Sequence, residues 1–237
     1  MIVFLLIACA IAGFLLLPPI AQDPSYHNFA DRRGLFGITS FLNLATNLAF
    51  LAVGVAGILL CVRRHELGVR RAWMACFIGV ALVSFGSAYY HLAPDNGTLV
   101  WDRLPMSIVF MALSVAVLAE YVNPRLEKYL LLPAIALGLA SVIYWHFTDD
   151  LRPYVLVQFL PLLMIPMILL LFRNPRKDRA FLLAAFVIYL VSKVAEYFDR
   201  KVFEWTGEMI SGHSLKHLLA ATALLVVYWM LRRRRFQ

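Results

Sequence analysis

Apolar residues dominate the chain in long runs that short polar segments interrupt. A helix needs about 17 to 25 predominantly apolar residues to cross the hydrocarbon core of a bilayer. Runs of that length lie near residues 2–18, 39–62, 72–92, 104–122, 129–147, 154–172, 180–198 and 212–231. The pattern predicts an all-α polytopic membrane protein: a helical bundle with a seven-helix core and one extra N-terminal transmembrane helix.

Composition supports this assignment. The chain is 62% hydrophobic with a mean hydropathy of +0.77, whereas soluble domains contain roughly 45 to 50% apolar residues. No linker, low-complexity tract or charge block divides the spans, so we expect one transmembrane domain over residues 39–237. Residues 21–38 mix turn-forming and aromatic residues, which is typical of an interfacial segment on the outer side.

The first apolar run is open to two interpretations. A cleaved signal peptide would have a basic region before the apolar run and a small-x-small cleavage site after it. The run lacks the basic region, and no clear site precedes Gln22. We therefore expect residues 1–20 to form a retained transmembrane helix or signal anchor.

The positive charge of the chain follows a topological pattern. The net charge is +8, and if the spans alternate in direction, 14 of the 22 Lys and Arg residues fall on one side of the membrane. They lie in the loops at 63–71, 123–128 and 173–179 and in the C-terminal tail. Because basic loops stay in the cytoplasm, the C-terminus is predicted to be cytoplasmic. The basic excess thus indicates topology and not a nucleic-acid partner.

Ionisable and polar residues gather at the outer ends of three spans. Ser87 and His91 are four residues apart near the end of one span, Asp102 begins the next, and His213 and His217 open the last. A four-residue spacing places both members of a pair on one helix face. Ionisable residues inside a span cost roughly 2.5 to 3.5 kcal/mol on insertion scales, so they mark functional sites. We expect these five side chains to meet at one depth on the non-cytosolic side.

The expected cluster has the composition of a catalytic zinc site. Three neutral imidazoles and one open position form a known ligand set, and two histidines four apart on a helix commonly supply part of it. We expect His91, His213 and His217 to bind Zn²⁺, which lowers the pKa of a bound water. Asp102 is expected to transfer protons, and Ser87 to hydrogen-bond the water or the oxyanion.

Structural roles for the same residues stay open at this point. An isolated pair of histidines is often interfacial, and Asp102 stands where a helix should begin, as an N-cap residue does. Ser87 is small enough simply to let two helices approach. Haem is a further use of membrane histidines, in an electron carrier, but it would leave Asp102 and Ser87 without a role.

Other polar residues in the spans have expected structural roles. Lys193, Glu196 and Asp199 lie three apart and should form a compensating ion-pair cluster, while Asn43 and Asn47 should hydrogen-bond between helices. The three cysteines lack a C-x-x-C spacing, and we expect all of them to be packing residues: Cys9, Cys61 and Cys76.

The segments GSAYYH, WDRLPM and GHSLKH together resemble the alkaline ceramidase family. That family belongs to a superfamily with the progestin and adipoQ receptors and the Per1-type lipid-remodelling proteins. The shared pattern is Ser-x3-His, an Asp separated from that His by ten residues, and a C-terminal His-x3-His. It falls on Ser87, His91, Asp102, His213 and His217. FLNLATNL at 41–48 and EYFD at 196–199 are similar to two further family motifs, so the resemblance runs from about residue 38 onward.

The resemblance implies a seven-helix bundle around a zinc ion that hydrolyses ceramide to a sphingoid base and a fatty acid. The expected partners are the bilayer and a ceramide-like lipid substrate. A receptor-type or lipid-remodelling member of the superfamily, without ceramidase activity, is the alternative. The calcium site of eukaryotic relatives is not carried over, because Ser40 replaces a family Glu and the segment YHNFADRRG is not acidic overall.

Overall fold

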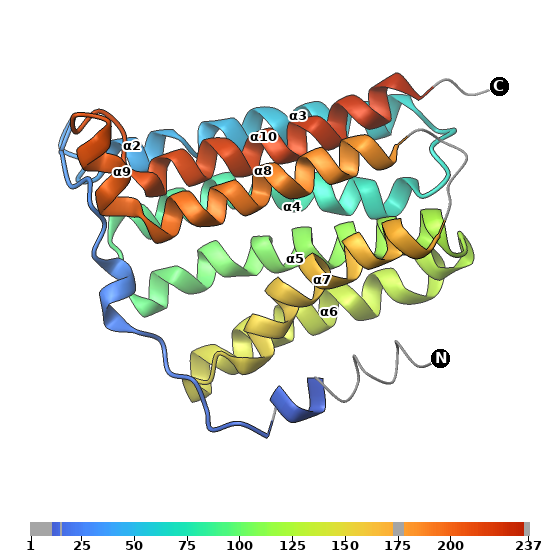
Figure 1. Ribbon diagram of the computed structural model, residues 1–237, viewed down its shortest axis with the longest axis horizontal. Coiled ribbons are helices and arrows are strands. Elements are labelled where there is room, and N and C mark those ends of the chain that lie inside the picture. Colours follow the sequence, from blue (N-terminus) through green and yellow to red (C-terminus); the bar gives the residue numbers. More distant parts are fainter. Residues whose placement is uncertain (1–10, 15, 173–177, 235–237) are drawn as a thin grey trace.

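The computed structural model describes residues 11–14, 16–172 and 178–234, and helices dominate this part of the chain (Figure 1). The elements are η1 (Pro24–His27), α2 (Phe41–Ala45), α3 (Leu48–Arg63), α4 (Arg70–Leu92), α5 (Asn96–Tyr121), α6 (Arg125–Thr148), α7 (Arg152–Leu171), α8 (Arg179–Tyr197), α9 (Asp199–Trp205) and α10 (Gly212–Arg233).

Seven helical stretches among the described residues are long and apolar enough to cross a membrane, with α2 and α3 together forming the first. The prediction of an all-α polytopic bundle is confirmed, and the chain is an integral membrane protein. The extra span predicted at 2–18 falls mostly outside the described residues and stays a prediction.

Helix α5 begins earlier than its apolar run. Hydropathy places the start near residue 104, but the helix starts at Asn96, because Asp95 caps it. The Asp95 side chain accepts a hydrogen bond from Thr98 N at 2.7 Å, and the Thr98 hydroxyl lies 3.1 Å from Asp95 N. This reciprocal capping box satisfies two backbone donors at the helix start. Asp102 therefore lies well inside the helix, and the N-cap role left open for it is wrong.

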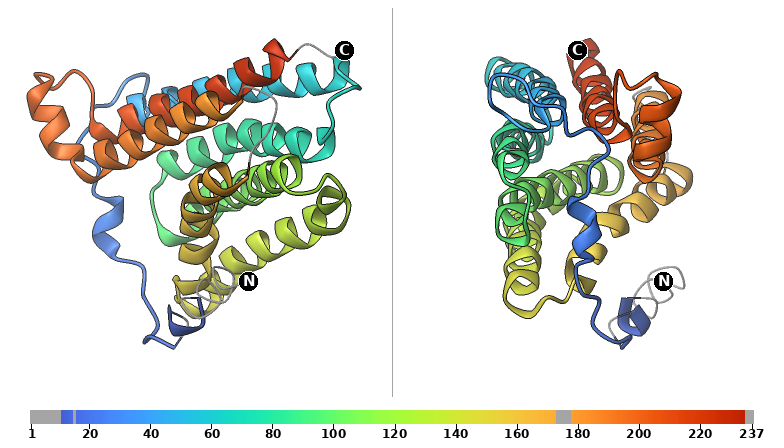
Figure 2. Two further views of the ribbon diagram at one scale, coloured as in Figure 1. Left: turned by 45° about the vertical axis from the view of Figure 1, so that its right-hand side comes forward. Right: turned by 90° about the vertical axis from the view of Figure 1, so that its left-hand side faces the viewer.

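The helices pack as a bundle in which sequence neighbours are mostly spatial neighbours (Figures 1 and 2). Helix α4 lies between α3 and α5, and α5 also packs against α6 and α7. The last helix, α10, returns between α3 and α8. Helices α7 and α8, although consecutive, meet only weakly. The bundle is therefore loosest between α7 and α8.

Large side chains fill the interior of the bundle, and other large apolar side chains cover its outside. Trp73, Phe77 and Met230 are almost fully buried, whereas Leu132 and Leu163 are more than 70% exposed. Lipid tails are as apolar as leucine, so exposed leucines are expected on the faces of a membrane bundle. Cys61 and Cys76 are buried free thiols, as predicted for packing residues, and Cys9 lies outside the described residues.

The segment before the first span crosses the ends of the helices at the α2 and α9 end of the bundle (Figure 1). Backbone and side-chain bonds tie it to the loop between α6 and α7. Leu151 N donates to Ile20 O at 2.8 Å, and Gln22 N donates to Asp149 Oδ1 at 3.1 Å. In that loop, hydrogen bonds from Arg152 hold the pKa of Asp150 at about 2, so Asp150 stays ionised.

A buried ion-pair network closes the opposite end of the bundle. Arg234, just after α10, contacts Glu120 of α5 through both terminal guanidinium nitrogens, Nη1 and Nη2, at 2.6 and 2.7 Å. The same guanidinium lies 2.8 Å from Asp178, which precedes α8. Trp73 Nε1 on α4 also donates to Glu120, at 2.8 Å. The network links the ends of four helices.

We predict that Glu120→Gln destabilises the protein by about 3 kcal/mol, because removing one partner leaves a buried cation poorly compensated. The measurement is thermal unfolding in detergent. Glu66→Gln is the matched control, since Glu66 is half-exposed and 3.8 Å from Arg64. Exposed pairs contribute at most about 1 kcal/mol. Equal melting temperatures for the two variants would contradict a stabilising role of the network.

Candidate metal centre

Three histidines from two helices converge at the α2 and α9 end of the bundle. His91 lies in the last turn of α4, and His213 and His217 lie in the first two turns of α10. All three are at least 96% buried. One ring nitrogen of each lies within 4.8 Å of the others, and the Nε2 atoms of His91 and His213 are 3.2 Å apart. Among the described residues this is the group of side chains that can hold a metal ion.

The start of α10 is held against α8 and α9 by backbone contact. Gly212 has no space for a side chain, because a Cβ there would lie 2.1 Å from the carbonyl oxygen of Ala195. Asp199 accepts a hydrogen bond from His213 N at 2.7 Å, and Ser211 caps the helix by accepting from Ser214 N at 3.1 Å. These bonds satisfy orphan donors at the helix N-terminus and fix the position of His213.

A second close contact brings the other site residues together. A Cβ on Gly86 would lie 2.0 Å from the carbonyl oxygen of Trp101, so the backbones of α4 and α5 touch at this point. Ser87 and Asp102 directly follow these two residues. Both side chains are buried, and both line the same cavity. The glycine therefore places the hydroxyl beside the carboxylate.

The hydrogen bonds of Thr46 settle which nitrogen of His217 faces the cluster. The Thr46 hydroxyl donates to Leu42 O at 2.8 Å and lies 3.0 Å from His217 Nδ1. Because its hydrogen is engaged, the hydroxyl accepts at this second contact, and Nδ1 carries the proton. His217 Nε2 then keeps a lone pair, which is how bonds to one ring nitrogen prepare the other for a metal.

The three imidazoles fit a divalent metal. Zinc binds histidine nitrogen at about 2.0 to 2.1 Å, so two tetrahedral ligands stand about 3.3 Å apart, close to the 3.2 Å between His91 and His213. His91 Nδ1 is buried without a hydrogen-bond partner. The His91 ring thus has no bonding contact other than the neighbouring histidine. A metal ion held by Nε2 would give this buried ring a ligand bond on the side that faces His213.

The surroundings of the cluster exclude water and add one nearby cation. The ring of Phe29 packs on His91 and His213, with centroids at 4.8 and 4.4 Å. Lys216 Nζ lies 3.2 Å from His213 Nε2 and 3.0 Å from Glu196 Oε1. A metal ion on His213 would replace the lysine at that nitrogen, while Glu196 would still compensate the ammonium charge.

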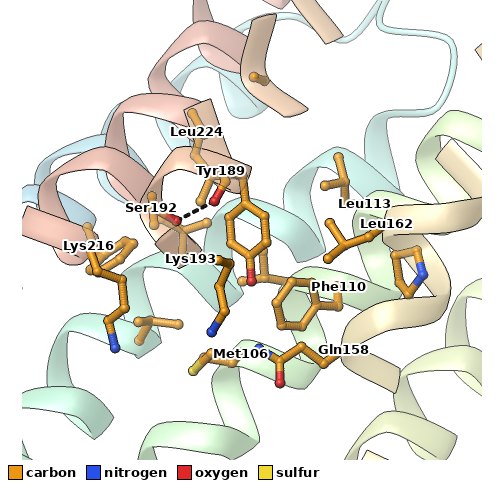
Figure 3. Close-up of a pocket in the computed structure, with 18 of the residues that line it drawn as sticks. Met106, Phe110, Leu113, Gln158, Leu162, Tyr189, Ser192, Lys193, Lys216 and Leu224 are labelled. Carbon is orange, nitrogen blue, oxygen red and sulfur yellow. Dashed lines mark hydrogen bonds between the residues drawn. The ribbon is translucent and has the colours of Figure 1, made fainter. Parts of the chain in front are cut away.

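An elongated cavity of about 220 Å³ begins beside the histidines. His217, Ser87 and Asp102 line it, whereas His91 and His213 lie behind His217, with ring centroids 5.2 and 4.8 Å from that ring. The remaining wall is largely apolar and comes from α4, α5, α7, α8 and α10. Figure 3 shows this wall, with Phe110, Leu113 and Leu162 facing the space that Lys193 and Lys216 enter from the other side.

The cavity reaches deep into the bundle. Its lining extends to Val117, Leu182 and Val227. Val117 and Val227 lie toward the ends of α5 and α10 that are far from the histidines, and Leu182 lies at the far start of α8. A cavity with polar groups at one end and apolar side chains along the rest suits a molecule with a polar head and a hydrocarbon chain.

The predicted ion-pair cluster is only partly correct. Lys193 and Glu196 form an ion pair, and Lys216 pairs with the same carboxylate. Asp199 does not take part, because α8 ends at Tyr197 and the chain turns. Asp199 instead accepts from the backbone of His213 and, at 2.8 Å, from Ala30 N. The prediction for Asp199 is therefore wrong.

The two asparagines differ in their bonds. Asn43 Oδ1 accepts from Ser211 and Ser214 of the α10 start, at 3.2 and 2.6 Å, which confirms the predicted contact between helices. Asn47 Nδ2 donates instead to the carbonyl of Asn43 within its own turn, at 2.8 Å. The interhelical prediction is thus wrong for this bond of Asn47.

Sequence reasoning missed several residues around the site. Phe29, Thr46, Arg103 and Lys216 had no assigned role. The signal available for Lys216 and Arg103 was their place next to His217 and Asp102. No local pattern pointed to Phe29 or Thr46, since both reach the histidines through contacts with distant segments.

The sequence pattern that defines the ceramidase family matches residues 36–235. This range covers all seven spans and the three histidines. The chain belongs to the ceramidase family. The family membership predicted from the motifs is confirmed, and it makes the protein a membrane-embedded hydrolase of the ceramidase type with a lipid substrate. A search of curated proteins found no significant match.

We predict that this ceramidase-family protein binds one zinc ion per chain, and that His91→Ala and His217→Ala each lose it. Two remaining imidazoles are too few for a stable site. Elemental analysis of purified protein measures the metal. His146→Ala is the matched control, because His146 is exposed on α6 and its loss should leave the metal content unchanged. Retention of zinc in both cluster variants would contradict the assignment.

We predict further that Thr46→Val weakens metal binding about 10-fold to 100-fold, as expected when a bond that orients a histidine ligand is lost. Competition with a chelator measures the dissociation constant. Thr46→Ser keeps the hydroxyl and should bind as the wild type does. Equal affinity of the valine and serine variants would show that the hydroxyl does not orient His217.

Proposed function

We propose that this protein is a zinc-dependent intramembrane hydrolase of a ceramide-like lipid amide, which it cleaves to a sphingoid base and a fatty acid. The observation that carries this proposal is the position of three clustered histidines at the polar end of an otherwise apolar cavity, beside Asp102 and Ser87.

His91, His213 and His217 hold the metal in this proposal. Zinc, when bound by three imidazoles, supplies an acidified water and polarises a substrate carbonyl. The protein contributes the dry, closed surroundings that make such electrostatic effects strong. Phe29 excludes water from one side of the histidines, and the helix packing excludes it from the others.

Asp102 transfers protons. Its carboxylate lines the cavity beside His217 and has Ser87 as its neighbour. It accepts a proton from the attacking water and later delivers it to the nitrogen of the leaving amine. Without that second transfer the amine would have to leave as an anion. The position inside α5, held by backbone contact with α4 at Gly86, gives the carboxylate a fixed place.

Ser87 stabilises the negative charge that develops on the amide oxygen. A hydroxyl held in place before the reaction donates a hydrogen bond to that oxygen without reorganising. Ser87 is buried on α4 and lines the cavity one turn before His91. Ser87 therefore shares the cavity lining with His217 and Asp102.

The acyl chain occupies the apolar length of the cavity and enters from the bilayer. Helices α7 and α8 meet only weakly, and residues of both line the cavity. A lipid that slides between them never exposes its chain to water. Exposure would cost about 0.8 kcal/mol per methylene. The sidewise path therefore suits a water-insoluble substrate.

The site is proposed to lie near the non-cytosolic surface. The histidines are at the end of the bundle opposite Arg233 and Arg234. By the positive-inside rule the basic end faces the cytoplasm. The hydrolysis then takes place in the outer half of the bilayer.

We predict that Asp102→Asn lowers fatty-acid release about 10²-fold to 10⁴-fold while the metal stays bound, since general acid-base catalysis contributes about that much. Release from a labelled ceramide and elemental analysis measure the two quantities. Glu204→Gln, an exposed carboxylate on α9, is the control and should keep full activity.

Normal turnover by the Asp102→Asn variant would refute the proton-transfer role. A zinc-loaded wild-type protein that releases no fatty acid from any lipid amide would instead favour a receptor-type member of the superfamily.

A further inference from the structure

Arg103 is a buried cation at the polar end of the cavity. It lies on α5 next to Asp102, lines the cavity and is only 6% exposed. Its Nη2 donates to Gln22 Oε1 at 2.5 Å, but Nη1 is buried without a hydrogen-bond partner. Within the described part of the chain, no carboxylate comes within ion-pair distance of this guanidinium. A buried charge without a partner is costly, so an unfilled donor at a cavity wall points to a ligand.

Aromatic rings hold the guanidinium in place without satisfying that donor. Its carbon lies 4.1 Å from the ring centroid of Trp145, 4.7 Å from Tyr154 and 5.7 Å from Tyr26. Stacked rings attract the face of a guanidinium, whereas the N–H groups point outward in its plane. The cage therefore fixes the direction of Nη1 and leaves its hydrogens free.

The charges that line the cavity do not balance. Arg103, Lys193 and Lys216 are cations, and Asp102 and Glu196 are anions. Glu196 pairs with both lysines, so its single charge serves two cations. Lys193 and Lys216 extend in the same direction from α8 and α10 (Figure 3). The lining carries one excess positive charge before any metal is counted.

We propose that Arg103 binds an anionic oxygen of the substrate, and that the preferred substrate is therefore a ceramide-like lipid amide whose headgroup carries a singly charged carboxylate or phosphodiester close to the scissile bond. The inference rests on the proposed hydrolysis, since it places the anion next to Asp102. A neutral headgroup hydroxyl would satisfy Nη1 but leave the charge excess. A single anionic group satisfies both.

The test compares amides that differ only in the headgroup. N-palmitoylserine carries a carboxylate, N-palmitoylserinol has a neutral hydroxymethyl group in its place, and the methyl phosphodiester of N-palmitoylethanolamine carries the alternative anion. A hydrogen bond to a charged group contributes enough to expect at least about a tenfold higher kcat/KM for one anionic amide over the serinol amide. The anionic amide that is cleaved with this preference shows whether the site binds a carboxylate or a phosphodiester.

Arg103→Gln should remove the preference by raising KM for the anionic amide. Arg103→Lys should keep part of it, because the charge stays while the planar fork is lost. Lys201→Gln removes the same charge from an exposed position on α9 and should leave the ratio at the wild-type value. Metal content and melting temperature verify that each variant is folded. If Arg103→Gln does not fold, the proposal is still tested by the ratio of kcat/KM values for the anionic and serinol amides in the wild type and in Arg103→Lys.

Binding separates this inference from the proposed hydrolysis. Stabilisation against thermal unfolding by the three amides is measured on the wild type and on Arg103→Gln. If no amide is cleaved but an anionic one stabilises the wild type more, and that difference is lost in Arg103→Gln, the hydrolysis fails and the anion site stands. If the serinol amide is cleaved and bound as well as the anionic ones, the hydrolysis stands and the anion site is overturned.

Discussion

Three buried imidazole rings lie close together in a membrane-embedded bundle, and much of the surrounding structure serves to keep them there. Asp199 fixes the start of the helix that carries two of them, and Thr46 orients one ring by accepting a hydrogen bond from its Nδ1–H group. Phe29 covers the other two. In a bilayer a polar group that finds no partner is expensive. The cluster is therefore stable only because each neighbour either hydrogen-bonds to it or shields it. Nδ1 of His91 still lacks a hydrogen-bond partner. The close approach of three buried ring nitrogens is the strongest structural reason to place a metal there.

The two ends of the bundle differ in how their buried cations are paired with carboxylates. At the cytoplasmic end of the proposed topology, one guanidinium faces two carboxylates, although its Nε lacks a hydrogen-bond partner. At the histidine end the cations outnumber the carboxylates along the cavity, and Arg103 keeps an unused donor. Ion pairs that join helix ends stabilise helix packing, whereas an excess of buried cations is compensated only when an anion binds. The contrast separates a structural network from a binding surface.

The segment before the first span completes the site, although most of it precedes the residues that match the family pattern. Gln22 bonds to Arg103, Phe29 packs on the histidines, and Ala30 N donates to Asp199. These contacts attach an irregular segment to four helices at once, α4, α5, α9 and α10. The family pattern thus describes the scaffold and the histidines, while this segment contributes the cover and part of the polar end of the cavity.

The sequence by itself determined the class of the protein and the members of its histidine cluster. Long apolar runs define spans because a bilayer has a fixed thickness, and a spacing of four defines a helix face because 3.6 residues make one turn. Alternation of the spans then places His91 and His213 at the same end. Only the tertiary structure decided that Asp102 lies inside α5, since polar residues extend that helix beyond its apolar run. It also decided that Asp199 serves a backbone donor, that aromatic rings from α6, α7 and η1 surround Arg103, and that the cavity runs along α5 and α10. Those contacts join residues far apart in the chain, and their geometry depends on how helices pack against one another, which no local pattern encodes.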